Sequence, residues 1–326
     1  MKNGKKSVRS LILFLAVLAA GTGLSGCRFH QESRKTRVAV IVKSTQSSFW
    51  KSVQAGASAA STEYNIQMSF EGPDSEEDYE TQNEMIENAV KEGVDAIVFS
   101  AVDYNANCQP IQEAAKQGIK IVVIDSDVNS DQVSCRIGTD NFQAGYMAGE
   151  AALQSEKEEL HIGIVNYDIH SANGQEREAG FRERIAKDDR VKTVETINVL
   201  STTEDAREKT KILLDRNPKI NVIATFNEWT SLGVGWAIRD IEARDRIWVT
   251  AFDSNAVSVG MLETGEVDSL IVQNPYAMGY LGVEAAVYLV NETGKPQESI
   301  GTDTILVNRD NMFEEECQKL LFPFSQ

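Results

Sequence analysis

Short apolar runs alternate with amphipathic stretches along most of the chain. Runs such as Arg37–Val42 and Lys120–Asp125 have the length and the Val/Ile content of buried strands, whereas Phe49–Tyr64 carries apolar residues at helical spacing. Gly93 and Gly118 each follow a predicted helix, where a left-handed cap residue is favoured. The predicted strands span residues 37–42, 67–70, 94–101, 120–125, 160–166, 194–199, 221–226, 246–252, 269–273 and 304–307, and the predicted helices span 49–64, 79–92, 108–117, 174–186, 204–215, 231–241, 257–262 and 280–290.

This alternation predicts an α/β fold. Near-continuously apolar strands that are separated by helices indicate parallel sheets covered on both faces. The pattern starts again at Leu160, and two strands in different halves end alike, in Asp125-Ser126 and in Asp253-Ser254. We therefore predict two similar lobes in which these two strands are equivalent.

The matched strand ends also predict a site. Ligands bind outside the carboxyl ends of the strands in open parallel sheets. Two lobes that face each other would place Asp125 and Asp253 on opposite walls of one cleft. An Asp at a strand–helix junction also commonly caps the following helix, and the residues alone leave both roles open.

Residues 1–26 have the layout of a secretory signal, with Lys2 to Arg9 as the basic part, Leu11–Ala20 as the apolar part and small residues after it. Ten apolar residues are too few for a membrane-spanning helix, which needs roughly 20. The sequence Leu24-Ser25-Gly26-Cys27 resembles the bacterial lipobox, whose cysteine becomes the lipid-modified first residue. We expect lipidation of Cys27, with residues 27–36 as a tether. An ordinary signal peptide with a chance cysteine is the alternative.

The chain is acidic, with a formal net charge of −17. Removal of residues 1–26 takes away four basic residues and no acid, which leaves 28 basic residues against 49 acidic ones. Such a surface repels nucleic acid, whose binding depends on phosphate neutralisation. It also disfavours anionic lipid surfaces, so we expect membrane attachment through the lipid. One acyl chain anchors only marginally, and bacterial lipoproteins carry several.

The sequence offers no pattern for catalysis or metal binding. After residue 26 there is no G-x-S-x-G, H-E-x-x-H or phosphate-loop motif, and no two histidines are spaced as zinc ligands on a helix. We therefore predict no catalytic residue, no metal and no cofactor. Apart from Cys27, the cysteines are Cys108, Cys135 and Cys317. Buried free thiols are expected, although export permits a disulfide between two of them.

Eight short motifs follow one another in a specific order: Lys43–Trp50, Gly93–Ile97, Gly118–Val122, Gly138–Asn141, Gly180-Phe181, Thr225–Glu228, Ala251–Asp253 and Ile271–Gln273. With these motifs, residues 37–315 resemble the ribose- and galactose-type sugar-binding proteins of bacterial import systems. The resemblance implies the type I periplasmic binding protein fold, in which two Rossmann-like lobes are joined by three crossing strands.

The resemblance also implies where the lobes divide. The crossings are expected near Thr139–Phe142, Phe252–Asn255 and Gln273–Pro275. The N-terminal lobe then comprises residues 37–139 and 274–302. The C-terminal lobe comprises residues 140–273 and 303–326.

Position by position, the resemblance implies that Phe49 and Trp50 pack on a sugar ring and that Asp125, Asn227, Asp253 and Gln273 bind its hydroxyls. Phe49 also fits the core stripe of its helix, so a packing role stays open. Secondary candidates are Ser47, Ser126 and Gln175.

The secondary candidates depart from the family pattern. Ser126 and Gln175 stand where the family often has arginine, and Ser47 stands where it has asparagine. Because the forked guanidinium groups are missing, ribose is in doubt, and another sugar, a polyol or a non-sugar polar ligand fits equally.

The implied function is that of a lipid-anchored, extracytoplasmic and monomeric solute-binding protein. It closes on a small polar ligand and delivers it to the permease of an ABC importer. A sensing subunit for a membrane histidine kinase or chemoreceptor is the alternative, because the lobe surfaces serve either role. Transcription repressors of this fold are disfavoured, since no basic helix-turn-helix segment precedes Val38.

Overall fold

The structure is a computed structural model that describes residues 34–294 and 296–322. The signal segment and Cys27 lie outside the described residues, so the expectation of a lipid anchor is not addressed by it. Within the described part of the chain, no helix is both long enough and apolar enough to cross a membrane.

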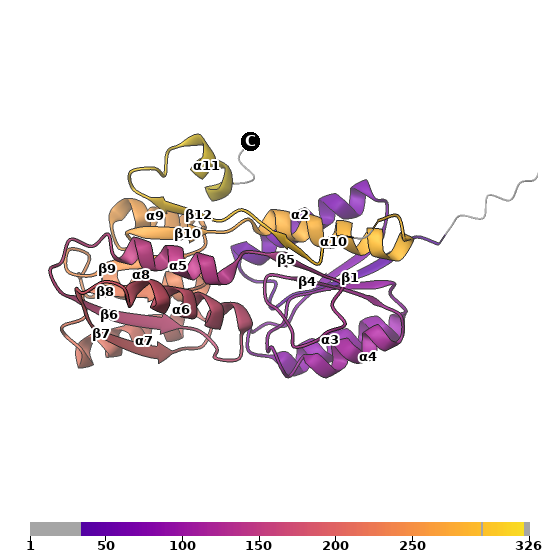
Figure 1. The fold of residues 1–326 in the computed structure, drawn as a ribbon, viewed down its shortest axis with the longest axis horizontal. Helices are drawn as coiled ribbons and strands as arrows, with labels where there is room; N and C mark the ends of the chain where they lie inside the picture. Colours follow the sequence, from indigo (N-terminus) through magenta and orange to yellow (C-terminus); the bar gives the residue numbers. More distant parts are fainter. Residues whose placement is uncertain (1–33, 295, 323–326) are drawn as a thin grey trace, which may run out of the picture. The chain divides into compact units, whose positions relative to one another are not determined.

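The N-terminal lobe is built on a sheet that, in the described residues, has six parallel strands in the order β11-β5-β4-β3-β1-β2. Helices α2 and α10 cover one face of this sheet and α3 and α4 cover the other (Figure 1). The elements are β1 (Arg37–Ile41), α2 (Ser48–Glu63), β2 (Gln67–Glu71), α3 (Tyr79–Glu92), β3 (Ala96–Phe99), α4 (Cys108–Lys116), β4 (Lys120–Ile124), β5 (Cys135–Gly138), α10 (Pro275–Asn291) and β11 (Ser299–Gly301).

The C-terminal lobe has a second sheet with the strand order β12-β10-β9-β8-β6-β7. Its strands are parallel except for β12, which runs antiparallel to β10. Helices α5 and α6 cover one face, and α7, α8, α9 and α11 cover the other. The elements are α5 (Asn141–Ala152), β6 (Leu160–Asn166), α6 (Ala172–Ile185), β7 (Val191–Asn198), α7 (Thr203–Arg216), β8 (Val222–Thr225), α8 (Glu228–Asp240), β9 (Trp248–Phe252), α9 (Ala256–Thr264), β10 (Ser269–Val272), β12 (Ile305–Asn308) and α11 (Glu315–Leu321).

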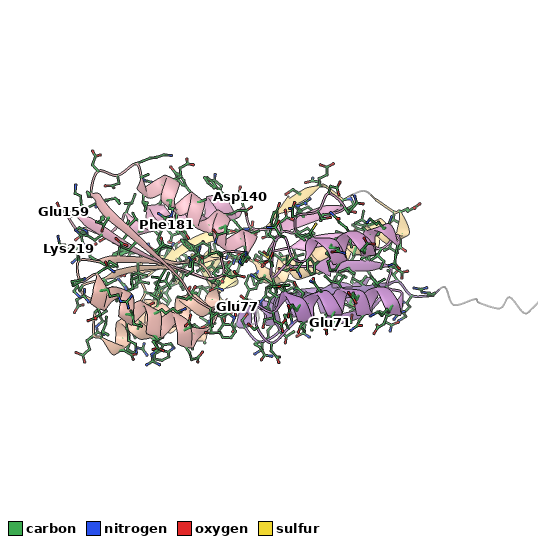
Figure 2. All side chains as sticks on the ribbon, turned by 90° about the horizontal axis from the view of Figure 1, so that it is seen from below. Glu71, Glu77, Asp140, Glu159, Phe181 and Lys219 are labelled. Carbon is green, nitrogen blue, oxygen red and sulfur yellow. The ribbon has the colours of Figure 1, made fainter. Side chains whose placement is uncertain are left out.

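The two sheets have the same order of equivalent strands. Strand β4 lies between β3 and β5, and β9 lies between β8 and β10. The predicted fold class, with two similar lobes and β4 equivalent to β9, is therefore confirmed. Phe181 lies inside the C-terminal lobe, Glu159 and Lys219 lie at its outer end, and Glu77 lies where the lobes meet (Figure 2).

Within the described residues the chain passes between the sheets at residues 139–140, 273–274 and 302–304. The expected crossing at Phe252–Asn255 is wrong, because β9 and α9 pack into the same core of the C-terminal lobe. The third crossing instead follows β11, a three-residue strand too short to give a hydrophobic pattern. We propose the lobe limits predicted from the sequence, residues 37–139 with 274–302 and residues 140–273 with 303–326.

Two helices, α8 and α10, begin at least three residues earlier than their apolar patterns predict. Asn227 caps α8, and its side chain and that of Thr230 form a reciprocal capping box. The Asn274 side chain caps α10 by accepting from the amide of Ala277, with Pro275 as the first helical residue. Both caps lie at strand ends, so they bring the start of each helix to the edge where the lobes meet.

Glycines allow one pair of helices in each lobe to touch backbone to backbone. A Cβ at Gly56 of α2 would lie 2.0 Å from the carbonyl oxygen of Tyr276 in α10. In the C-terminal lobe, a Cβ at Gly145 of α5 would lie 1.9 Å from the carbonyl oxygen of Arg177 in α6. No larger residue fits at either contact without moving a helix. The close packing thus fixes α2 and α6, two of the three helices that supply pocket residues, the third being α8.

Candidate functional site

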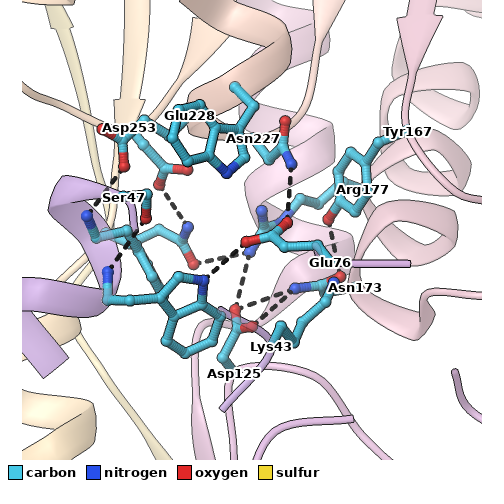
Figure 3. Close-up of a pocket in the computed structure, with 14 residues that line it drawn as sticks. Lys43, Ser47, Glu76, Asp125, Tyr167, Asn173, Arg177, Asn227, Glu228 and Asp253 are labelled. Atoms are coloured by element: carbon cyan, nitrogen blue, oxygen red, sulfur yellow. Dashed lines mark hydrogen bonds and ion pairs between the residues drawn. The ribbon is translucent and has the colours of Figure 1, made fainter. Parts of the chain in front are cut away.

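The two matched aspartates have the same backbone conformation. Asp125 directly follows β4 with φ 58°, and Asp253 directly follows β9 with φ 66°, which is the left-handed region that Asp tolerates better than most residues. The Asp125 amide donates to the carbonyl of Ile137 (3.1 Å) and the Asp253 amide to that of Ile271 (2.9 Å). Both side chains reach the same pocket between the lobes (Figure 3).

The pocket is small and is lined by both lobes. Its 14 lining residues enclose at most about 310 Å³, so a ligand held there has to be a small molecule. The lining includes seven of the residues predicted from the sequence: Ser47, Phe49, Trp50, Asp125, Asn227, Asp253 and Gln273. That these side chains contact a ligand stays a prediction.

The structure does not bring Ser126 and Gln175 to this pocket. Ser126 is fully buried, and its hydroxyl has no hydrogen-bond partner among the described residues. Gln175 is exposed on α6. Residues four apart share a helix face, and the inward face of α6 presents Asn173 and Arg177. Gln175 lies midway between them and therefore points the other way.

Seven lining residues were missed by the sequence analysis: Lys43, Glu76, Tyr167, Asn173, Arg177, Glu228 and Trp229. Most of them follow a strand, with Lys43 after β1, Glu76 after β2, Tyr167 after β6 and Glu228 after β8. The carboxyl ends of parallel strands meet at one edge, so the same rule that selected the two aspartates would have found these residues too.

Phe49 and Trp50 form an aromatic wall. Their rings meet edge to face with centroids 4.9 Å apart. Trp50 is 2% exposed, and its indole Nε1 donates to Glu76 Oε1 at 2.7 Å. Both rings belong to the core of the N-terminal lobe and also line the pocket. Phe49 therefore packs in the core of its lobe, the role that the sequence left open, and it also lines the pocket.

Arg177 lies between the two aspartates. It is 1% exposed and donates to Asn141 Oδ1, to the carbonyl of Phe226 and to Gln273 Oε1, at 2.8–2.9 Å. Its Nη2 is 3.7 Å from Asp125 Oδ1. Gln273 in turn donates to Asp253 Oδ1 at 2.6 Å. One buried guanidinium thus connects both strand ends.

The pocket is rich in hydrogen-bond acceptors. It contains four carboxylates, from Glu76, Asp125, Glu228 and Asp253, and two cations, from Lys43 and Arg177. Burial raises the pKa of Asp253 to about 7, although the nearby guanidinium of Arg177 opposes the shift. Such a lining favours ligands that donate hydrogen bonds through hydroxyls and disfavours anions.

Hydrogen bonds cross from one lobe to the other around the pocket. Asn173 Nδ2 donates to Asp125 Oδ1 and Oδ2 at 3.0 and 3.1 Å. Lys43 Nζ donates to Ser171 Oγ at 2.8 Å and lies 5.2 Å from the ring centre of Tyr167. The lobes are in contact over the pocket in this structure, so the arrangement is that of a closed site.

Among the described residues, no group of three or more His, Cys, Asp or Glu side chains is arranged to hold a metal ion. The three cysteines in this part of the chain are unpaired. Cys135 and Cys317 are buried, as expected from the sequence, whereas Cys108 is half-buried and its thiol donates to the carbonyl of Asn129.

Comparison with known proteins decides the family. The family model of the periplasmic binding protein domain matches residues 38–296. The chain belongs to this family. It is a family of binding proteins and not of enzymes, which agrees with the lack of catalytic motifs.

Several relatives match nearly the whole chain. The Pseudomonas aeruginosa D-ribose/D-allose-binding protein is 23% identical over 86% of this chain and 91% of its own length. A carbohydrate transporter solute-binding protein from Agrobacterium radiobacter, solved with D-arabinose, is 29% identical with a TM-score of 0.85, over 88% of this chain and 99% of that one. An ABC transporter solute-binding protein from Agrobacterium vitis, solved with D-fucose, is 29% identical with a TM-score of 0.84, over 87% and 99%.

Proposed function

We propose that this periplasmic binding protein captures a small neutral sugar or polyol between its lobes and delivers it to an ABC importer. The observation that carries the proposal is the pocket itself, which joins an aromatic wall to a lining rich in acceptors and is closed by both lobes. The solved relatives with D-arabinose and D-fucose support the sugar class.

The roles of the residues follow from their chemistry. The apolar face of a sugar ring packs on Phe49 and Trp50, whose rings line the pocket. Asp125 and Asp253 accept hydrogen bonds from hydroxyls, one from each lobe, and Gln273 both donates and accepts. Ligand binding shifts the population from open to closed lobes, because only the closed form contacts the ligand from both sides.

The ligand class is tested by a thermal-shift screen of neutral sugars and polyols, followed by calorimetry with the best hit. Asp125→Ala and Asp253→Ala each leave ligand hydroxyls without their acceptor in a pocket that is closed to water, which costs about 1–3 kcal/mol. We therefore expect roughly tenfold or greater weakening of binding for each variant. Asp215→Ala, at an exposed position of α7, is the matched control and binds like the wild type.

Two results would count against the proposal. Affinity that survives both pocket substitutions unchanged means that the ligand binds elsewhere. A best hit that is an anion keeps the site and removes the ligand class, because four carboxylates line the pocket against two cations.

We also propose that the protein is attached to the outer face of the cell membrane through a lipid on Cys27. The support is the signal layout followed by Leu24-Ser25-Gly26-Cys27. Cys27→Ala is expected to leave the protein folded and to release it from the membrane fraction or block its processing. Unchanged membrane association of this variant excludes the lipid anchor.

A further inference from the structure

The N-terminus of α2 is capped from the opposite lobe. The first amides of a helix have no partner within the helix and need acceptors from elsewhere. Ser47 Oγ accepts from the Trp50 amide at 3.3 Å within the N-terminal lobe. The carboxylate of Glu228, which opens α8 of the C-terminal lobe, accepts from the amides of Ser48 (3.2 Å) and Phe49 (2.9 Å).

The indole of Trp50 is also linked to the opposite lobe. Glu76 Oε1 accepts from Trp50 Nε1 at 2.7 Å, and its other oxygen, Oε2, accepts from Ser201 Oγ at 2.8 Å. Ser201 Oγ in turn accepts from Asn227 Nδ2 at 2.7 Å. Ser201 and Asn227 both follow strands of the C-terminal lobe, so Glu76 joins the indole to that lobe.

A hydrogen bond within the C-terminal lobe fixes the side chain of Glu228 in the position that this contact requires. Its side chain accepts from Asn255 Nδ2 at 2.8 Å, and both residues lie at strand ends of the C-terminal lobe. Glu228 is 5% exposed, and a carboxylate at a helix N-terminus is favoured by the helix dipole. When the lobes separate, the bond to Asn255 persists and the bonds to Ser48 and Phe49 are lost.

We propose that Glu228, assisted by Glu76, is a positioning residue that couples lobe closure to the aromatic wall. The wall belongs to the N-terminal lobe, yet two of its backbone amides are capped by Glu228 of the C-terminal lobe. The carboxylate of Glu76 that holds the indole is itself bonded by Ser201 of that lobe. The backbone of the wall therefore has all of its hydrogen-bond partners only in the closed protein. The consequence of the coupling is a longer lifetime of the closed, ligand-bound complex, and this consequence rests on the proposed function.

Amide hydrogen exchange tests the coupling directly, because it reports whether the Ser48 and Phe49 amides have partners. Exchange is measured without sugar and with saturating D-arabinose, D-fucose or the best hit of the sugar screen. In the wild type we expect protection of these amides to rise with closure. In Glu228→Gln, whose amide group carries one acceptor oxygen instead of two, we expect at least a threefold loss of that protection.

The control is Glu204→Gln, the same substitution at an exposed position in the first turn of α7. It should leave exchange at residues 48–50 unchanged. Amides within α8 should keep their protection in Glu228→Gln, which separates a lost contact from a destabilised lobe. The proposal is overturned if the amides of residues 48–50 exchange at the same rate in Glu228→Gln and in the wild type. It is also overturned if these amides are never protected in the wild type.

Binding kinetics give the second readout. With the sugar that binds, Glu228→Gln should release it roughly fivefold faster while the association rate stays within about twofold, because the contact forms after encounter. Glu228→Asp keeps the charge on a shorter side chain and should lie in between. If no neutral sugar binds, the proposed function fails while the exchange experiment still decides the coupling. If a sugar binds and its dissociation rate is unchanged in Glu228→Gln, the coupling fails while the function stands.

Discussion

Asp125 and Asp253 show how equivalent strand ends acquire different roles. Both follow the equivalent strand of their sheet, both have a left-handed backbone, and both donate their amide to the neighbouring strand. Asp125 is bonded by Asn173 of the opposite lobe and by Ser100 of its own. Asp253 is bonded by Gln273 of its own lobe at 2.6 Å.

The difference lies in what happens when the lobes separate. The bond between Asp125 and Asn173 exists only in the closed form, because its partners belong to different lobes. The bond between Asp253 and Gln273 persists in either form. Local backbone geometry is thus shared, and the neighbouring helices and strands decide whether an aspartate serves closure or the integrity of one lobe.

The largest effect is expected from removing the cation that both aspartates share. Arg177→Met leaves buried carboxylates and carbonyls without their donor, and breaking a buried pair of this kind costs about 3–5 kcal/mol. We expect the free energy of unfolding, measured in urea, to fall by about that amount. Arg182→Met, which removes a partly exposed guanidinium paired with Glu178, should cost under about 1 kcal/mol. A similar small loss in both variants would show that Arg177 does not stabilise the pair.

A matched exchange of amide for carboxylate separates the two aspartates. Asn173→Asp turns the group that faces Asp125 from a donor into an acceptor, and Gln273→Glu does the same beside Asp253. Each change sets two carboxylates against each other, which costs about 1–3 kcal/mol. At pH 8, Asn173→Asp should weaken sugar binding tenfold or more with little change in the Tm of the sugar-free protein, because its lobes can part.

Gln273→Glu should instead lower the Tm of the sugar-free protein, since its two carboxylates belong to one lobe and cannot separate. Scanning calorimetry and titration calorimetry of both variants measure the two effects. An identical pattern in the two variants contradicts the distinction between the strand ends.

The smallest effect concerns the pH dependence of stability. Burial raises the pKa of Asp253 to about 7, against an ordinary value of 3.8. Between these two pH values Asp253 keeps a proton in the folded protein and releases it in the unfolded chain. Its contribution therefore lowers the free energy of unfolding as pH rises from about 4 to 7, and it causes no further change above pH 7. The Tm of the wild type should therefore fall by a few degrees relative to Asp253→Asn across this range.

Asp240→Asn is the control for the pH experiment. The hydrogen bond from Arg207 lowers the pKa of Asp240 to about 2, so the stability that this group contributes is lost only as pH falls from about 4 to 2. The two difference curves should thus have opposite signs in separate pH windows. A flat difference between wild type and Asp253→Asn from pH 4 to 7 contradicts the raised pKa.

Most of the elements that form the two sheets could be predicted, and the exceptions have physical causes. Strands such as β1 and β4 are buried on both faces, and their near-continuous apolar runs identify them as strands in the sequence. Helix α5 is rich in Ala and Gly and has no distinct apolar stripe, so its pattern did not predict a helix. Strand β11 has only three residues, too few for a hydrophobic pattern, so the apolar runs did not predict it or the crossing that follows it.

The candidate site divides in the same way. Residues directly after long apolar strands, such as Asp125 and Asp253, were predicted because a strand end is visible in the sequence. Arg177 was missed, since nothing in the local sequence shows that it is buried against Phe252 and bonded to Gln273. Asn173 was missed for the same reason, because its partner Asp125 is 48 residues away in the other lobe.

The sequence by itself determined the two repeated lobes and the strand ends at which binding side chains gather, because period and length of apolar runs are local properties. Only the tertiary structure decided which of these ends meet. Glu228 caps the N-terminus of α2 by accepting from the amide of Phe49, a residue that lies 179 positions earlier in the chain. Such a contact depends on how two separately formed lobes close on each other, and no local pattern encodes that geometry.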